Sequence, residues 1–197
     1  MENIHEFIQE LGLENNITLE DIPDIDLYMD QVIQLFENKF SGSKRDSNDK
    51  VLTKTMINNY AKGKLFIPIK NKKYAKEHLI LISLIYQLKG ALSINDIKVT
   101  LDGVNNDFLK GRVDLEELYN SYLHLATINV NNFKQDFVSR ASESSNEVSQ
   151  WNHKGSEPLN DVLLIASLVN ISNIYRRAAE KLVDQLVDQD IPSTKKG

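Results

Sequence analysis

Lysines, asparagines and threonines gather in one short stretch, VLTKTMINNYAKGKLFIPIKNKKYAKEHL, at residues 51–79. Thr53 is a suitable N-cap for a short helix, and Gly63 occupies the position where a left-handed residue would end it. Asparagine amides on such a helix can pair with adenine N6 and N7 in the major groove, while lysines neutralise phosphates. The stretch therefore has the residue types that binding to duplex DNA requires.

The predicted contacts to DNA divide between this helix and the lysine-rich turn that follows it. On the helix, the threonines and the helix N-terminus would hold a phosphate, and the two asparagines would contact bases. Beyond the helix, the KNKKY turn would lie along the DNA backbone or in the minor groove. The complete predicted DNA-binding set is Thr53, Lys54, Thr55, Asn58, Asn59, Lys62, Lys64, Lys70, Asn71, Lys72, Lys73 and Tyr74.

Each of these residues also has a simpler interpretation. Asn58 and Asn59 would then only solvate a helix face, and the lysine turn would be the soluble tip of a hairpin. Tyr60 and Tyr74 would pack in the core or at its edge. It is the combination of the helix, the basic turn and the apolar helices downstream that favours DNA binding.

The formal net charge is −5, but the charges are distributed unevenly. Residues 1–43 carry ten acidic side chains and one basic side chain, whereas residues 44–99 carry twelve basic and four acidic ones. Residues 100–197 carry ten basic and fourteen acidic side chains. This concentration of positive charge predicts one localised surface for a polyanion, with a merely solvated lysine face as the alternative.

Other functional classes find little support in the sequence. Cysteine is absent, which excludes disulfides, thiolate catalysis and thiolate metal sites. The four histidines are scattered, and no phosphate-loop, dinucleotide-binding or serine-hydrolase motif occurs. His124, between Leu123 and Leu125, is predicted to lie in an apolar interior rather than to bind a metal ion. We therefore expect no enzymatic activity, no cofactor and no metal ion.

Helical patterns dominate the rest of the chain. Apolar residues recur at helical spacing in residues 3–11, 26–40, 76–89, 93–101, 114–137 and 160–189. Asp26 is a plausible N-cap for the second of these helices, and Ser93 with Asp96 forms a capping pair for the fourth. Residues 105–113 are a predicted linker, and residues 139–158 are polar with few signals of ordered structure, with Trp151 as their one anchor.

One short strand is expected after the lysine-rich helix. Leu65–Ile69 is predicted as an edge strand because Pro68 cannot donate to a ladder, and the chain would return at Tyr74 after a turn at 70–73. The elements together predict an all-α protein with a small two-stranded β-wing. Its predicted parts are a helical segment (1–19), a DNA-binding domain (20–103), a helical dimerisation or effector domain (104–191) and a tail (192–197).

The order of elements from residue 51 to 101 resembles the DNA-binding domain of the MerR family of bacterial regulators. The similarity consists of a recognition helix closed by an aromatic residue and a glycine, a wing ending in a basic residue and tyrosine, and a pair of helices. The matching residues are Ile57, Tyr60, Gly63, Leu65, Pro68, Lys73, Tyr74, Leu79, Ile82, Ile85, Leu88, Leu92, Ser93, Ile94, Ile97 and Leu101. More narrowly, residues 20–101 look like a family of uncharacterised MerR-like proteins of Gram-positive bacteria.

This resemblance implies a MerR-like winged helix-turn-helix domain that binds double-stranded DNA sequence-specifically in a bacterial transcriptional regulator. The sequence departs from the MerR pattern in the long loop at 41–52 between the first two helices. It also has Asn58 and Lys73 where arginine is usual, so bidentate arginine contacts are unavailable there. A helical C-terminal half would form a homodimer matched to two half-sites, or else complete the monomer core. The effector, if there is one, is not identified by the sequence.

The main alternative is a non-enzymatic helical adaptor that uses the basic winged-helix face for an acidic protein partner. Both interpretations place the protein in the cytoplasm. The acidic N-terminal stretch lacks the features of a signal peptide, and no apolar stretch is long enough to span a bilayer. We therefore expect no membrane association.

Overall fold

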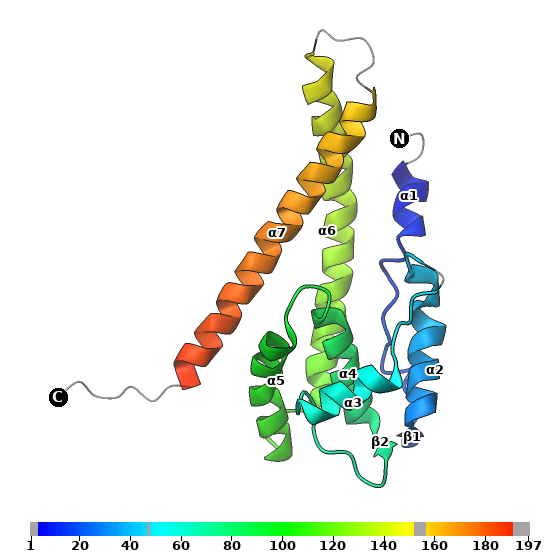
Figure 1. Cartoon of the computed structure of the whole chain (residues 1–197), viewed down its shortest axis with the longest axis vertical. Coiled ribbons are helices and arrows are strands. Elements are labelled where there is room, and N and C mark those ends of the chain that lie inside the picture. The colour runs from blue at the N-terminus through cyan, green and yellow to red at the C-terminus, as the bar shows by residue number, and fades with distance from the viewer. Residues whose placement is uncertain (1–3, 47, 152–156, 191–197) are drawn as a thin grey trace, which may run out of the picture.

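The computed structural model describes residues 4–46, 48–151 and 157–190 (Figure 1). The chain is mostly helical with one small two-stranded sheet, which confirms the predicted class at that level. The predicted tail at 192–197 lies outside the described residues. The elements are α1 (Ile4–Glu10), β1 (Leu27–Tyr28), α2 (Met29–Phe40), η1 (Ser41–Ser43), α3 (Lys54–Lys62), β2 (Lys73–Tyr74), α4 (Lys76–Leu88), α5 (Ile94–Leu109), α6 (Leu115–Ser149) and α7 (Glu157–Asp190). None of the described helices combines the length and apolarity needed to cross a membrane.

The main core forms where α2, α3, α4, α5 and the start of α6 meet. Helix α4 lies at its centre because apolar residues surround most of its circumference, and Leu79, Ile82 and Ile85 are completely buried. The segment before β1 joins the same core, since the Tyr119 hydroxyl donates to the carbonyl oxygen of Ile17 at 2.6 Å. This core holds α3 in place through the buried side of that helix.

The sheet differs from the predicted wing. Strand β2 pairs antiparallel with β1, so Leu27 lies opposite Tyr74 and Tyr28 opposite Lys73. The prediction of a strand at Leu65–Ile69 is wrong, because that segment forms no ladder; only an isolated bridge joins Lys70 to Lys73. The prediction of a helix from Asp26 is also corrected: β1 precedes α2, and the backbone N–H of Tyr28 donates to Gln31 Oε1 at 2.8 Å.

Helix α5 begins as the sequence predicts. The backbone N–H of Asp96 donates to Ser93 Oγ at 3.1 Å, and the backbone N–H of Ser93 donates to Asp96 Oδ2 at 3.2 Å, which is a capping box. The helix then continues to Leu109, so the start of the predicted linker at 105–113 is helical instead. The predicted domain boundary at 103–104 falls within α5.

Helices α6 and α7 are 35 and 34 residues long. The Asp114 carboxylate caps α6 by accepting from the backbone N–H of Glu116 at 2.8 Å. The polar segment 139–158, which showed few signals of ordered structure, is helical as far as Ser149, since its first part contains no proline or glycine. Ser144 there donates from Oγ to the carbonyl oxygen of Asn160 at 2.9 Å. The anchoring role predicted for Trp151 does not fit its exposure of 42%.

The two long helices separate along their length. Figure 1 shows α6 and α7 close together where α6 ends and α7 begins, and apart near α5. A second, small cluster of Ile8, Phe137 and Leu164 packs α1 against the close part of this pair. His124 is exposed on α6, so its prediction as an interior residue is wrong: it lies on a different side of the helix from the buried Tyr119 and Phe137.

Candidate nucleic-acid interface

Helix α3 presents a polar face because its apolar residues recur on one side only. Ile57 and Tyr60 are buried in the main core, whereas Asn58 and Asn59 are exposed. The predicted N-cap is confirmed, since Thr53 Oγ1 accepts from the backbone N–H of Met56 at 3.1 Å. The other predicted residues of the helix, Lys54, Thr55 and Lys62, are exposed as well.

The end of α3 departs from the prediction that Gly63 adopts the left-handed conformation. Gly63 has φ −74°, and the left-handed residue is Lys64, with φ 56°. The backbone N–H of Leu65 donates to the carbonyl oxygen of Tyr60, and that of Lys64 to Ala61, both at 3.0 Å, which is a Schellman motif. Gly63 is required for space instead: a Cβ there would lie 2.6 Å from Leu65 Cδ1.

The lysine-rich turn is a tight two-residue connection. Asn71 and Lys72 have φ values of 53° and 59°, and the backbone N–H of Lys73 donates to the carbonyl oxygen of Lys70 at 2.9 Å. Two successive positive φ values are the mark of a type I′ turn. The turn exposes Lys70, Asn71 and Lys72 together. Figure 1 shows it at the same end of the molecule as α3 and the β1–β2 pair.

Backbone strain is concentrated in these predicted residues. In the described part of the chain, the non-glycine residues with positive φ are Lys64, Asn71 and Lys72. Asparagine tolerates this conformation, but a lysine in it costs about 1–2 kcal/mol relative to the right-handed form. Stability alone would therefore favour glycine or asparagine at positions 64 and 72.

The lysines of the set differ in their partners. The Lys54 ammonium lies 2.7 Å from Asp30 Oδ1, and that of Lys73 lies 5.5 Å from the ring centroid of Tyr28. Within the described residues, Lys62, Lys64, Lys70 and Lys72 have no carboxylate oxygen within 4 Å. These four lysines are the ammonium groups best placed to bind an external anion.

Sequence reasoning missed Asp30 and Tyr28, the partners of Lys54 and Lys73. Tyr28 lies in β1 and Asp30 at the start of α2. Neither the capping residues nor the spacing of apolar residues indicated that these two side chains would contact lysines. The sequence holds no clear signal for these contacts, because β1 has only two residues, too few for an alternating pattern.

Tyr74 is a correction to the predicted set. Its side chain is 1% exposed, with ring centroids 6.4 Å from Phe66 and 6.0 Å from His78, and burial raises the pKa of its phenol. A buried ring cannot contact a phosphate outside the protein. The simpler interpretation of Tyr74 as a core residue fits its position, and the same holds for Tyr60.

The connection between α2 and α3 is held against α2 rather than projecting freely. Glu37 of α2 forms an ion pair with Lys44 and accepts from the backbone N–H of Val51 at 3.4 Å. Val51 and Leu52, which precede the N-cap of α3, are buried. Helices α2 and α3 are therefore in contact across a long connection, not across the tight turn of a simple helix-turn-helix.

The described residues do not group histidines and carboxylates in a way that could hold a metal ion. Residues 17–122 match a family model described as a domain of unknown function, DUF1836. This range is more than half of the 197 residues and contains the main core and every predicted DNA-binding residue. No curated protein and no solved structure matches the chain.

Proposed function

This chain belongs to the DUF1836 family, and we propose that it binds double-stranded DNA sequence-specifically as a dimeric transcriptional regulator. The observation that carries the proposal is that exposed lysines occupy strained, left-handed backbone positions. Lys64 and Lys72 occupy left-handed positions where glycine would be more stable. Strain of this kind persists where the side chain serves a function, and an exposed ammonium serves binding to phosphate.

The exposed face of α3 supplies the groups that would read bases. Asn58 and Asn59 project from the helix between Lys54 at one end and Lys62 at the other. An amide can donate to adenine N7 and accept from adenine N6, so these two side chains would contact A·T base pairs in the major groove. Lys62, Lys64, Lys70 and Lys72 would contact phosphates and fix the orientation of α3.

Helices α6 and α7 would supply the dimer. Tyr175, Leu182 and Leu186 of α7 lie on one stripe of the helix and are 71%, 63% and 41% exposed, which is unusual for large apolar side chains. A second copy packed on this side of α7 would bury them. A twofold dimer would present two α3 helices to two half-sites of a palindromic operator.

The experiment that tests this proposal is selection of bound duplexes from a random DNA pool near physiological salt. We expect enrichment of a palindromic motif, whose half-site spacing reports the separation of the two α3 helices. The double variant Lys70→Glu, Lys72→Glu should weaken binding to every sequence by on the order of 100-fold. Asn58→Ala should instead relax the preference at one base pair, by about 1–3 kcal/mol of discrimination.

Lys181→Glu provides a matched control, because Lys181 is exposed on α7, outside the predicted DNA-binding set. A folded dimer that enriches no motif would contradict sequence-specific binding. If that dimer still bound an acidic protein through the same lysines, the function would be that of an adaptor. Equal binding by the parent and the Lys70→Glu, Lys72→Glu variant would show that the lysines of the turn do not form the interface.

A further inference from the structure

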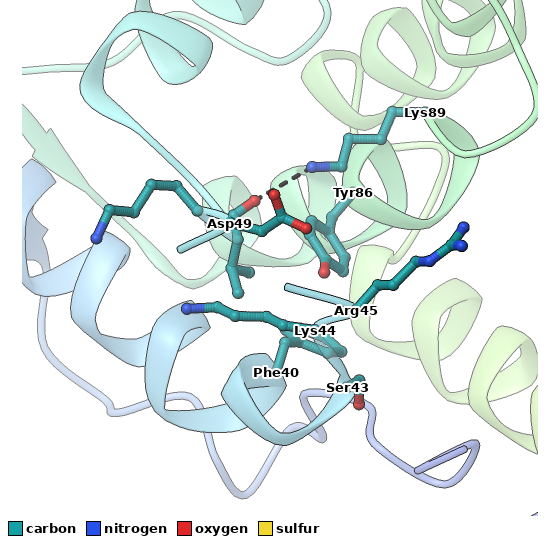
Figure 2. A pocket seen from close by; sticks show the side chains of 9 residues that line it. Phe40, Ser43, Lys44, Arg45, Asp49, Tyr86 and Lys89 are labelled. Atoms are coloured by element: carbon teal, nitrogen blue, oxygen red, sulfur yellow. Dashed lines mark hydrogen bonds between the residues drawn. The ribbon is translucent and has the colours of Figure 1, made fainter. Parts of the chain in front are cut away.

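A cationic pocket lies apart from the predicted DNA contacts, between the end of α2, the chain from Ser43 to Val51 and the end of α4 (Figure 2). Its volume is about 290 Å³. The residues that line it are Phe40, Ser43, Lys44, Arg45, Asp49, Lys50, Val51, Tyr86 and Lys89. Four of them are basic and one is acidic, so the lining carries a marked excess of positive charge.

Lys89 is the central cation of this pocket. Its ammonium donates to the carbonyl oxygen of Val51 at 3.2 Å and lies 4.3 Å from the ring centroid of Tyr86. Among the described residues, no carboxylate oxygen comes within 4 Å of it. The group is partly buried, and desolvation lowers its pKa. An anion in the pocket would compensate this charge.

The other basic residues surround the same space. Figure 2 shows Lys89 on one side, Lys44 and Arg45 on the opposite side, and Tyr86 and Asp49 between them. The Lys44 side chain is only 11% exposed and is paired with Glu37. Arg45 is exposed and, within the described residues, has no ion-pair partner within 4 Å. The pocket thus combines the partly buried ammonium of Lys89, the paired ammonium of Lys44 and the exposed guanidinium of Arg45.

We propose that this pocket binds the phosphoryl group of a small phosphorylated molecule, either a phosphomonoester or a diphosphate. Such a ligand carries about two or more negative charges near neutral pH, which suits a lining with a net excess of cations. Lys89 and Lys50 would neutralise the phosphate, and the guanidinium of Arg45 could engage two of its oxygens. Asp49 would repel the phosphate and so set a limit on its affinity. The ring of Tyr86 would contact the remainder of the ligand.

The pocket also has a physical connection to α3. Val51 is held from both sides, through its carbonyl oxygen by Lys89 and through its N–H by Glu37, two residues before the N-cap Thr53. An anion that attracts Lys89 would compete with its contact to Val51, and one that attracts Lys44 would weaken the ion pair between Lys44 and the Glu37 carboxylate that binds Val51. Binding of an anion in the pocket would then alter how α3 is presented to DNA. This consequence rests on the proposed function, whereas the binding of the anion does not.

The test is titration calorimetry of the full-length protein with inorganic pyrophosphate at constant ionic strength, without DNA. We expect saturable binding with a Kd below about 1 mM. Lys89→Gln and Lys50→Gln should each raise that Kd by about tenfold, as expected for loss of one charge-assisted contact. Asp49→Asn should lower it several-fold, because it removes the repelling carboxylate. Lys181→Gln on α7 should leave it unchanged.

Lys50 is exposed, so Lys50→Gln tests the site even if Lys89→Gln impairs folding, which thermal unfolding would reveal. Absence of saturable binding, or binding that Lys50→Gln and Asp49→Asn leave unchanged, would overturn the proposal. If pyrophosphate does not bind but Lys50→Gln weakens DNA binding, the pocket serves a DNA phosphate rather than a small molecule. Binding to pyrophosphate without any DNA binding would retain the pocket and reject the proposed function.

Discussion

Asn105 of α5 donates a hydrogen bond from Nδ2 to the carbonyl oxygen of Leu65, at 3.0 Å and across 40 residues of sequence. Leu65 directly follows the left-handed Lys64, so this contact fixes the chain at the point where it leaves α3. The other polar atom of this side chain, Asn105 Oδ1, is buried and has no hydrogen-bond partner within the described structure. The Asn105 amide, from a helix outside the candidate interface, thus adds to the two backbone hydrogen bonds that hold Lys64 and Leu65 at the end of α3.

Replacement of Asn105 by alanine should lower the free energy of unfolding by about 1–3 kcal/mol, because it leaves the Leu65 carbonyl oxygen without its partner. Urea denaturation monitored by circular dichroism measures this difference. Asn106→Ala is the matched control, since Asn106 is the exposed neighbour on the same helix, and its effect should stay within about 0.5 kcal/mol. Equal effects of the two substitutions would show that the Asn105 contact adds no stability.

Lys64→Gly and Lys72→Gly should each raise the free energy of unfolding by about 1 kcal/mol, since glycine adopts positive φ without a steric penalty. The same variants should bind DNA less tightly because each removes an ammonium group. Lys70→Gly separates the two effects: Lys70 does not have positive φ, so this variant should lose affinity without gaining stability. A loss of stability in Lys64→Gly or Lys72→Gly would contradict the strain argument.

Features that depend on a few neighbouring residues could be predicted from the sequence. The N-cap at Thr53 and the capping box of Ser93 and Asp96 depend on side chains that reach only three residues along the chain. The exposure of Asn58 and Asn59 follows from the spacing of Ile57 and Tyr60 on one helix. These predictions needed no knowledge of tertiary contacts.

Features that depend on distant partners could not be predicted in this way. Strand β2 pairs with β1, a two-residue strand too short to show an alternating pattern, so the sequence favoured the wrong partner at Leu65–Ile69. The chain after the left-handed Lys64 is held by Asn105, 40 residues away from Leu65 in sequence, and no local pattern indicated this contact.

Stability should fall as the pH drops below about 6.5, because His78 is neutral in the core. Desolvation lowers the pKa of His78, while a hydrogen bond to the Pro68 carbonyl oxygen raises it in part. As the pH falls, His78 therefore takes up a proton near pH 6.5 in the unfolded chain but only at a lower pH in the folded chain. Its contribution to stability is fully present above about pH 6.5 and is lost as the pH falls toward the pKa of His78 in the folded chain. The expected slope is about 1 kcal/mol per pH unit.

His78→Gln should reduce this slope. Glutamine at the same position can still accept the backbone N–H of Ala75, which now donates to His78 Nδ1 at 3.1 Å, so the start of α4 is preserved. The measurement is urea denaturation of the variant and of the parent protein at the same pH values between 5 and 7. His124→Gln, at the exposed histidine of α6, should keep the slope of the parent. An unchanged slope in His78→Gln would assign the pH dependence to other groups.

Affinity for DNA should fall by about two orders of magnitude per subunit when the salt concentration rises fourfold, and by about twice as many orders for a dimer on two half-sites. This estimate takes the four lysines without a carboxylate partner, Lys62, Lys64, Lys70 and Lys72, as four phosphate contacts. Six contacts, with Lys54 and Lys73 included, would give about three orders of magnitude. Fluorescence anisotropy across a salt series therefore distinguishes the two sets, and Lys54→Gln should leave the slope unchanged if only four lysines contribute.

Leu182→Glu on α7 should convert the proposed dimer to a monomer. Leu182 is 63% exposed on the part of α7 that has separated from α6, so in a single chain a glutamate there would meet water at little cost. In a dimer that buries this position, the same carboxylate would be desolvated without a partner. Sedimentation equilibrium measures the molecular mass, and thermal unfolding checks that the chain remains folded.

The matched control for the dimer is Gln185→Glu, which introduces the same charge at an exposed polar position of α7 less than one turn away. It should leave the dimer intact if the interface is formed by the apolar side chains Tyr175, Leu182 and Leu186. The monomeric variant should also lose the preference for paired half-sites, because each α3 would then bind alone with half the phosphate contacts. A Leu182→Glu protein that stays dimeric would move the interface to another surface.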